Sequence, residues 1–264
     1  MKPRKQRLDN LLNLLCTHNM GYYEFISKFS DIEELSGFMD VRDIDIWCAL
    51  GLDIIKTEQN EIELLTRFRD ISEQEICVVD IETSGGINTG QIIEIGAVKI
   101  KNSVEIGRFE SFVSAPFVPE NITELTGIST DDLVGAPSLS YVLEKFKLFL
   151  GTSLFVAHNV NFDYGFISQS LDQIGLGMLL NRKLCTIDLA RRTIASEKYG
   201  LGSLKELLGI NNLHHRALND AIAAAEILKI SLSRLPFSVQ TTEDLIKFSK
   251  TAPSMKLKPE PVLV

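Results

Sequence analysis

The sequence has few of the features that mark secreted or membrane proteins. Its four cysteines lie far apart, which excludes a C-x-x-C motif and predicts buried thiols in a reducing cytoplasm. It has no apolar run of roughly 18 residues, the length that a membrane span needs. The basic start, Met1 to Lys5, leads into leucines at helical spacing and not into a signal peptide. We therefore expect a cytoplasmic protein without a membrane segment.

The sequence also lacks an excess of basic residues, with 27 Lys and Arg against 35 Asp and Glu and a formal net charge of −8. A sequence-specific DNA reader usually carries a basic surface, so this balance argues against one. A carboxylate cluster that holds divalent cations adds negative formal charge, which the cations neutralise. The acidic balance is therefore compatible with an enzyme that holds a few nucleotides at a metal site.

The pattern of apolar residues divides the chain into three regions. Residues 1–70 predict a small, mainly helical N-terminal domain, whose final hairpin resembles that of a winged-helix module. Residues 75–235 alternate strands with helices and predict an α/β fold, a mixed sheet with helices on both faces. Residues 236–264 predict a C-terminal helix followed by a flexible tail rich in Lys and Pro.

Four acidic residues lie at the ends of predicted strands or in the first turns of predicted helices. Asp80 and Glu82 end a buried strand and, being two residues apart, point to the same face. Asp163 follows the buried strand 154–157, and Asp220 lies near the start of an alanine-rich helix. Taken singly, each position has an ordinary explanation, because strand ends meet solvent and acidic residues favour helix N-termini.

Together the four carboxylates suit a pair of divalent cations. Mg²⁺ and similar hard cations prefer oxygen ligands and leave room for phosphate and water. Two such ions about 3.5–4 Å apart can clamp the attacking and leaving oxygens of phosphoryl transfer. His215, just before the alanine-rich helix, has the side chain that suits a general base near neutral pH.

The chain contains three motifs: Asp80-x-Glu82, His158-Asn159-x-x-Phe162-Asp163 and His215-x-Ala217-x-x-Asp220. In order and spacing they resemble the motifs of the DEDD exonuclease superfamily, histidine branch. Segments 92–98 and 125–128 are also similar to this family. Within it, residues 75–232 are most similar to the proofreading (epsilon) subunits of bacterial DNA polymerase III. The resemblance implies a ribonuclease-H-like fold with a five-stranded sheet, and removal of nucleoside monophosphates from 3′ ends.

The resemblance also implies a role for each site residue. Asp80 would bridge two divalent cations, Mg²⁺ or Mn²⁺. Glu82 and Asp220 would complete the site of the ion that activates water. Asp163 would serve the second ion, beside the leaving 3′ oxygen. His215 would accept the proton of the attacking water.

Four further residues are expected to contact the substrate. Thr83 would lie near the terminal 3′-hydroxyl, and Asn159 would contact the nucleotide backbone. Ile128 and Phe162 would pack against the last bases without reading their identity. Glu94 lies in a predicted strand, where a place in the site and a structural role are both open.

The implied partners are single-stranded or frayed DNA 3′ ends and the DNA polymerase III catalytic subunit. Segment 240–245 resembles the glutamine-led peptides that bind the sliding clamp, but the acidic Glu243 stands where an apolar residue is expected. The alternative is a helix over 244–248 that packs on the domain. The motifs do not separate DNA from RNA as the substrate. A non-catalytic docking subunit is a third reading, which the presence of all five site residues disfavours.

Overall fold

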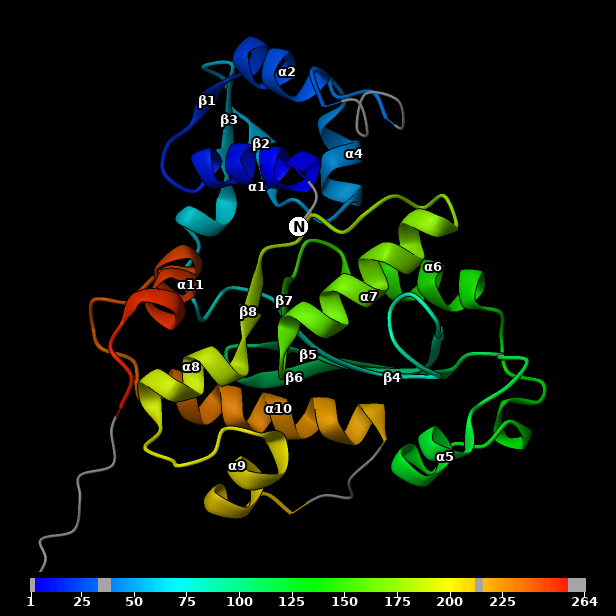
Figure 1. The fold of residues 1–264 in the computed structure, drawn as a ribbon. Coiled ribbons are helices and arrows are strands. Elements are labelled where there is room, and N and C mark those ends of the chain that lie inside the picture. The colour runs from blue at the N-terminus through cyan, green and yellow to red at the C-terminus, as the bar shows by residue number, and fades with distance from the viewer. Residues whose placement is uncertain (1–2, 33–38, 212–215, 256–264) are drawn as a thin grey trace, which may run out of the picture.

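The computed structural model describes residues 3–32, 39–211 and 216–255 (Figure 1). The helices are α1 (Pro3–Leu15), α2 (Tyr22–Ser30), α4 (Ile44–Ala49), α5 (Glu120–Thr126), α6 (Leu139–Leu150), α7 (Val160–Gln173), α8 (Thr186–Thr193), α9 (Leu201–Leu208), α10 (Ala217–Leu232) and α11 (Thr242–Thr251). The strands are β1 (Met20–Gly21), β2 (Ile54–Lys56), β3 (Glu61–Leu64), β4 (Ile76–Thr83), β5 (Ile92–Lys101), β6 (Val104–Phe112), β7 (Leu154–Ala157) and β8 (Lys183–Cys185). Two 3₁₀ turns are η1 (Leu65–Arg67) and η2 (Asp131–Leu133).

The main sheet has five strands in the order β6-β5-β4-β7-β8. β4, β7 and β8 run parallel, whereas β5 and β6 pair antiparallel beside β4. The β5–β6 hairpin turns at Asn102 and Ser103, which take φ values of 50° and 60° as tight hairpin turns require. The predicted mixed five-stranded α/β sheet is therefore confirmed.

Helices cover both faces of this sheet, and the alternation of side chains along β4 assigns each residue to one face. Cys77 and Val79 belong to the core beneath α6 and α7. Ile76 and Val78 belong to the core that α8, α10 and α11 cover. Asp80, which continues the second set, is thus directed to the face that α10 covers.

The N-terminal region packs helices α1, α2 and α4 around a three-stranded sheet of order β1-β3-β2. Its centre is an aromatic group of Phe25, Phe29 and Trp47, in which both phenyl rings meet the indole edge to face and the centroid distances are 4.5 to 5.0 Å. Leu180, from the segment before β8, completes this core. The region is helical with a terminal hairpin, as the sequence predicts; its status as a separate, winged-helix-like domain stays a prediction.

The C-terminal residues form a docked helix. α11 begins with a capping box in which Thr241 and Asp244 bond each other's backbone. Leu245 and Ile246 are buried in the core beneath the main sheet. Segment 240–245 is thus the start of a packed helix. Of the predicted C-terminal helix and tail (236–264), residues 256–264 lie outside the described residues.

The four cysteines are free, but only Cys77 is fully buried. Burial raises the pKa of its thiol to about 12. Cys16, Cys48 and Cys185 are partly exposed, so the prediction of buried thiols is right for one of the four. Within the described ranges, no helix is long and apolar enough to cross a membrane.

Candidate active site

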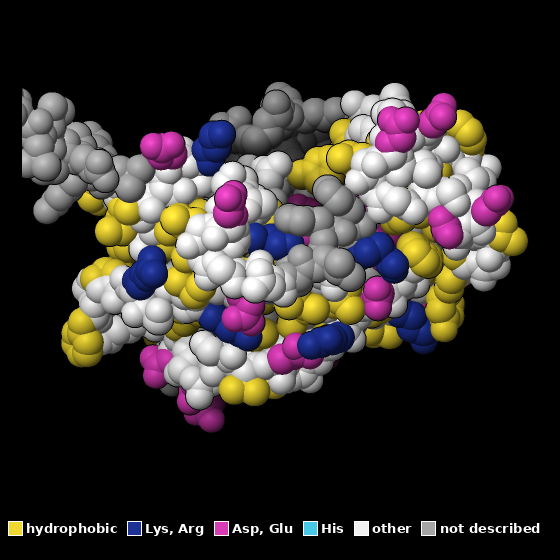
Figure 2. All heavy atoms as spheres, turned by 90° about the horizontal axis from the view of Figure 1, so that it is seen from below, with side chains coloured by type: hydrophobic (Ala, Val, Ile, Leu, Met, Phe, Trp, Pro, Cys, Tyr) yellow, Lys and Arg dark blue, Asp and Glu magenta, His cyan; other side chains and the backbone are white. Residues whose placement is uncertain are grey.

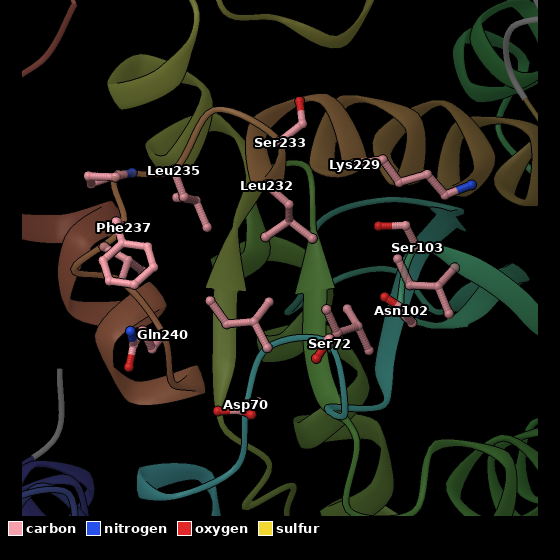
Figure 3. A pocket seen from close by; sticks show the side chains of 15 residues that line it. Asp70, Ser72, Asn102, Ser103, Lys229, Leu232, Ser233, Leu235, Phe237 and Gln240 are labelled. Carbon is pink, nitrogen blue, oxygen red and sulfur yellow. The ribbon is translucent and has the colours of Figure 1, made fainter.

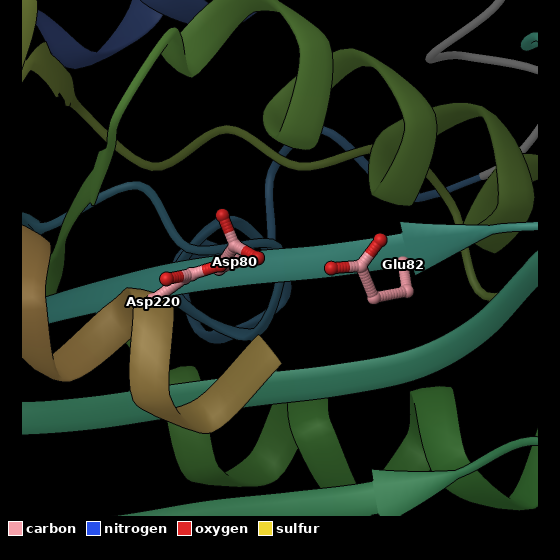
Figure 4. A group of neighbouring side chains, drawn as sticks. All are labelled: Asp80, Glu82 and Asp220. Atoms are coloured by element: carbon pink, nitrogen blue, oxygen red, sulfur yellow. The ribbon is translucent and has the colours of Figure 1, made fainter. Parts of the chain in front are cut away.

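Three of the predicted ligands meet at the carboxyl end of β4. Asp80, Glu82 and Asp220 each offer a carboxylate oxygen, and these oxygens all lie within 4.8 Å of one another. Figure 4 shows Asp80 and Glu82 along β4, with Asp220 reaching them from the first turn of α10. We call these three residues the acid cluster. Segments 140 residues apart in sequence thus supply one group of ligands.

Small residues bring Asp220 to this position. Gly96 of β5 lies directly opposite Asp80 in the sheet. A Cβ atom at Gly96 would lie 2.1 Å from the backbone nitrogen of Leu218, so only glycine admits the start of α10 here. Ala217, like the later alanines of α10, is buried against the sheet. The sequence predicts the alanine-rich helix, but it does not reveal that Gly96 makes room for the start of this helix.

Glu94 anchors the start of α10. Its side chain is fully buried, and its two carboxylate oxygens accept hydrogen bonds from the backbone N–H of Ala217 (3.0 Å) and from Nε of Arg216 (2.9 Å). A carboxylate at a helix N-terminus interacts favourably with the helix dipole. Arg216 also lies over the ring of Phe112, 4.8 Å from its centroid. The described contacts of Glu94 are therefore those of an anchor for α10.

Asp163 is a buried carboxylate whose charge acts on Asp80. It is 3% exposed, in the first turn of α7. Burial raises its pKa to about 7, although hydrogen bonds from its own backbone and that of Ile81 oppose this. Burial, followed by the charges of Asp163, Glu82 and Asp220, also raises the pKa of Asp80 well above its ordinary value. Asp80 therefore interacts with the carboxylates of Asp163, Glu82 and Asp220.

The four carboxylates fit divalent cations. Burial and then the charge of Glu94 raise the pKa of Glu82 to about 7, so like charges crowd this edge of the sheet. Carboxylate oxygens are the ligands that hard divalent cations prefer, and a bound cation relieves such crowding. The donor set therefore fits divalent cations and not a soft metal that needs thiolate or imidazole ligands.

Of the two motif histidines, His158 and His215, the structure describes the contacts of His158. His158 bridges Thr186 and Tyr199: its Nδ1 lies 2.8 Å from the threonine hydroxyl, and its Nε2 donates to the tyrosine carbonyl at 2.9 Å. Burial lowers the pKa of its imidazole to about 4, so at neutral pH it is an uncharged cross-link. His215, the predicted general base, lies outside the described residues.

The predicted substrate contacts differ in their exposure. Phe162 is 44% exposed on α7, which leaves its ring available for stacking. Asn159 is exposed and has a left-handed backbone (φ 84°) ahead of α7. The hydroxyl of Thr83 donates to the carbonyl of Gly85 at 2.9 Å.

Ile128 is 2% exposed and packs with Ile93, Val118 and Leu133 in a small core beside α5. Its apolar side chain therefore contributes to this local core, and its contact with a base stays a prediction.

A pocket of about 640 Å³ lies elsewhere, where β4 begins and α10 ends (Figure 3). Its lining includes Ile76, Asn102, Leu232 and Phe237, and none of the predicted site residues. Since Ile76 begins β4 and Asp80 lies near its end, the pocket is separate from the acid cluster. It adds no residue to the carboxylate site.

A buried α/β sheet with carboxylates gathered at its edge defines a class of protein, a nuclease-like enzyme that depends on divalent cations. The family model described as exonuclease, of the RNase T type, matches residues 77–228. Because this match covers more than half of the sequence, the chain belongs to the exonuclease family.

Two relatives of this chain are PolC-type DNA polymerases III. The PolC-type DNA polymerase III of Clostridium perfringens is 42% identical over 167 residues, which is 62% of this chain and 12% of that protein. The PolC-type DNA polymerase III of Caldanaerobacter subterraneus subsp. tengcongensis is 44% identical over 168 residues, with the same coverage. The chain thus matches about an eighth of the length of these relatives.

Solved exonucleases share the fold. Exonuclease I aligns with a TM-score of 0.56 at 16% identity, over 62% of this chain and 42% of its own. Exonuclease X in complex with 5′ overhanging duplex DNA aligns with a TM-score of 0.50 at 24% identity, over 66% and 99%. The predicted ribonuclease-H-like exonuclease fold is confirmed. The exonuclease family match and the similarity to PolC-type DNA polymerase III identify residues 77–228 as a 3′→5′ exonuclease domain related to that of DNA polymerase III.

Proposed function

We propose that this chain removes nucleoside monophosphates from DNA 3′ ends and that it acts in proofreading during DNA replication. One observation carries the proposal: Asp80, Glu82 and Asp220, from two separate motifs, bring their carboxylate oxygens within 4.8 Å. The relatedness to PolC-type DNA polymerase III favours DNA over RNA as the substrate. A direct comparison of the cleavage rates on DNA and RNA distinguishes proofreading from RNA trimming.

In the proposal, two Mg²⁺ or Mn²⁺ ions share the carboxylates. Asp80, Glu82 and Asp220 would hold one ion, and Asp80 with Asp163 the other. When bound, the ions would activate the attacking water and offset charge on the leaving oxygen. The assignment of Asp80 as the shared ligand is supported by its interaction with all three other carboxylates, because the charges of Asp163, Glu82 and Asp220 all raise its pKa.

The remaining residues would handle the proton and the substrate. His215 would accept the proton of the attacking water. His158 would not compete for this role, because its ring nitrogens are both engaged and its pKa is lowered to about 4. Phe162 would stack on a terminal base, while Asn159 and Thr83 would contact the nucleotide backbone and the 3′ end.

The proposed setting is cytoplasmic, with a DNA polymerase III catalytic subunit as partner. A sliding-clamp contact through residues 240–245 has no support from the described fold. Leu245 is buried there, and Glu243 is bonded to Arg182 and Thr66. Clamp binding would require α11 to leave its place.

The test is a time course on matched 5′-labelled single-stranded DNA and RNA, with Mg²⁺, with Mn²⁺ and with EDTA. We expect a metal-dependent ladder that shortens by single nucleotides from the 3′ end and forms faster on DNA. A ladder that forms faster on RNA would replace proofreading by RNA trimming. No cleavage of either substrate would leave a docking subunit as the function.

A further inference from the structure

A buried lysine lies beside the acid cluster and was not singled out in the sequence. The Lys205 side chain is 4% exposed, and its Nζ lies 3.9 Å from Oδ1 of Asp220, itself 11% exposed. Lysine is almost never fully buried unless it is paired. Among the ion pairs between described residues, this is the one that reaches the acid cluster.

The short helix α9 fixes the direction of this lysine. Leu204, next to Lys205, is buried in a core shared with Ile227 of α10, which holds α9 against that helix. Gly209 ends α9 in a left-handed conformation, and the backbone N–H of Ile210 closes the turn on the Lys205 carbonyl at 2.9 Å. The backbone of Lys205 is thus held by the packing of Leu204 and by the C-terminal turn of α9.

The other described cation near this edge is engaged elsewhere. Arg216 pairs with Glu94 at 2.8 Å and with Glu110 at 3.4 Å. It therefore offsets the buried Glu94 and not the cluster itself. Figure 2 shows the molecule from below, where acidic and basic side chains are interspersed over the described surface. Lys205, which is 4% exposed, adds little to any such surface and acts locally on Asp220.

We propose that the Lys205 ammonium is a built-in counter-charge of Asp220, which a divalent cation must outcompete when it binds. The lysine stabilises the site while it is empty of cations and weakens the hold on the cation nearest Asp220. Lys205 acts through Asp220 and is thus a positioning residue that sets metal affinity. The inference rests on the proposed function only in taking Asp220 as a cation ligand.

The experiment is Mn²⁺ binding by isothermal titration calorimetry to wild type, Lys205→Met and Lys205→Arg. Methionine keeps the length of the side chain without its charge, and arginine keeps the charge. We expect Lys205→Met to bind Mn²⁺ about fivefold or more tightly, because a cation next to a ligand carboxylate repels the metal. Lys205→Arg should remain near the wild-type affinity, as should Lys198→Met, which removes an exposed lysine.

A second measurement follows unfolding by urea with EDTA and with saturating Mn²⁺. With EDTA, Lys205→Met should be less stable than wild type, and Mn²⁺ should close the gap. Unchanged or weaker Mn²⁺ binding by a folded Lys205→Met would overturn the inference. If that variant does not fold, the wild type decides through the Lys205 side-chain NMR signal, assigned from Lys205→Arg. A Mg²⁺ titration that leaves the signal in place would overturn the inference.

Failure of the proposed function gives a different result. If Asp80, Glu82 and Asp220 hold no cation, wild type and Asp80→Ala bind Mn²⁺ equally. If only the role of Lys205 is wrong, Asp80→Ala loses binding while Lys205→Met matches wild type. Neither readout depends on cleavage of DNA.

Discussion

Two clusters of buried charge in this chain are built in opposite ways. The acid cluster places Asp80, Glu82 and Asp220 together with one sign of charge. Where the N-terminal region meets α11, Arg182 and Glu243 instead form two parallel hydrogen bonds, each 2.7 Å long. Both are largely shielded from solvent, but the acid cluster has one described ion pair, with Lys205, for three carboxylates, whereas Arg182 and Glu243 are a matched pair.

The electrostatics of the two clusters differ accordingly. Burial would lower the pKa of Arg182, but its hydrogen bond to Glu243 outweighs this and raises it. In the acid cluster, burial and neighbouring carboxylates both raise the pKa of Asp80. The paired cluster therefore joins parts of the fold, whereas the acid cluster carries the excess negative charge that the proposed cations would neutralise.

Removing a central carboxylate tests this contrast most strongly. Asp80→Ala should abolish exonuclease activity, because Asp80 is the proposed shared ligand. The same change should make the metal-free protein more stable, since it removes crowding between like charges. Cleavage assays with Mg²⁺ and urea unfolding with EDTA measure the two effects.

The matched control is Glu197→Ala, which removes an exposed carboxylate outside the helices and strands. It should change neither activity nor stability measurably. Asp80→Ala with near-wild-type cleavage would refute the metal-site assignment. If Asp80→Ala were less stable than wild type without metal, repulsion between the carboxylates would not be what destabilises the metal-free acid cluster.

The second largest effect concerns the proton. His215→Ala should slow cleavage by about 10²–10⁴-fold, the usual contribution of a general base. Mn²⁺ binding should persist, because the carboxylates remain. Single-turnover cleavage separates the chemical step from binding. The neighbouring His214→Ala is the control and should cleave near the wild-type rate; the reverse pattern would move the base to His214.

The sequence predicted most of the site because its chemistry is local. Asp80 and Glu82 share a face by strand periodicity, and Asp220 follows from a helix start. The close approach of α10 needed Gly96, whose meaning depends on the β4–β5 register. No spacing along the chain reveals that a glycine 16 residues from Asp80 lies opposite it.

Other features also depend on tertiary packing. The side chain of Ile128 fills a local core with Ile93, Val118 and Leu133, whereas its contact with a base stays a prediction. The place of Lys205 beside Asp220 depends on the packing of α9 against α10. Tertiary packing determines all of these features.

The paired cluster gives the third prediction. Glu243→Ala should lower the free energy of unfolding by about 2–4 kcal/mol, because it leaves Arg182 shielded and uncompensated and removes a 2.7 Å hydrogen bond from Thr66. Exonuclease activity below the unfolding transition should remain, since neither residue is near the acid cluster. Urea unfolding measures the loss.

A double-mutant cycle with Arg182→Met supplies the control for this pair. Replacing both partners should cost less than the sum of the single changes, since no buried charge is left alone. Strictly additive losses would show that the two side chains do not interact. Loss of activity in step with stability would show that the junction also shapes the site.

The smallest effect is the pH dependence of stability that comes from Glu82 of the acid cluster and from the nearby Asp163. Glu82 and Asp163 have pKa values of about 7 in the folded, metal-free protein, above ordinary values of 4.5 and 3.8. The folded state thus holds protons that the unfolded state has released. The stability contributed by these groups is full below their ordinary pKa values and is lost as the pH rises through about 7. His158 has the opposite effect, because its lowered pKa costs stability as the pH falls below 6.5.

Comparing wild type with Asp163→Asn cancels the contribution of His158, which both proteins share. With EDTA, the stability of Asp163→Asn relative to wild type should increase from about pH 5 to about pH 8, because only wild type must ionise a crowded Asp163. With saturating Mg²⁺ the trend should reverse, because the ionised Asp163 then gains a cation. A stability difference between Asp163→Asn and wild type that stays constant with pH in EDTA would mean that Asp163 is already ionised without metal. Repulsion between like charges would then not distinguish this edge of the sheet from the Arg182–Glu243 pair.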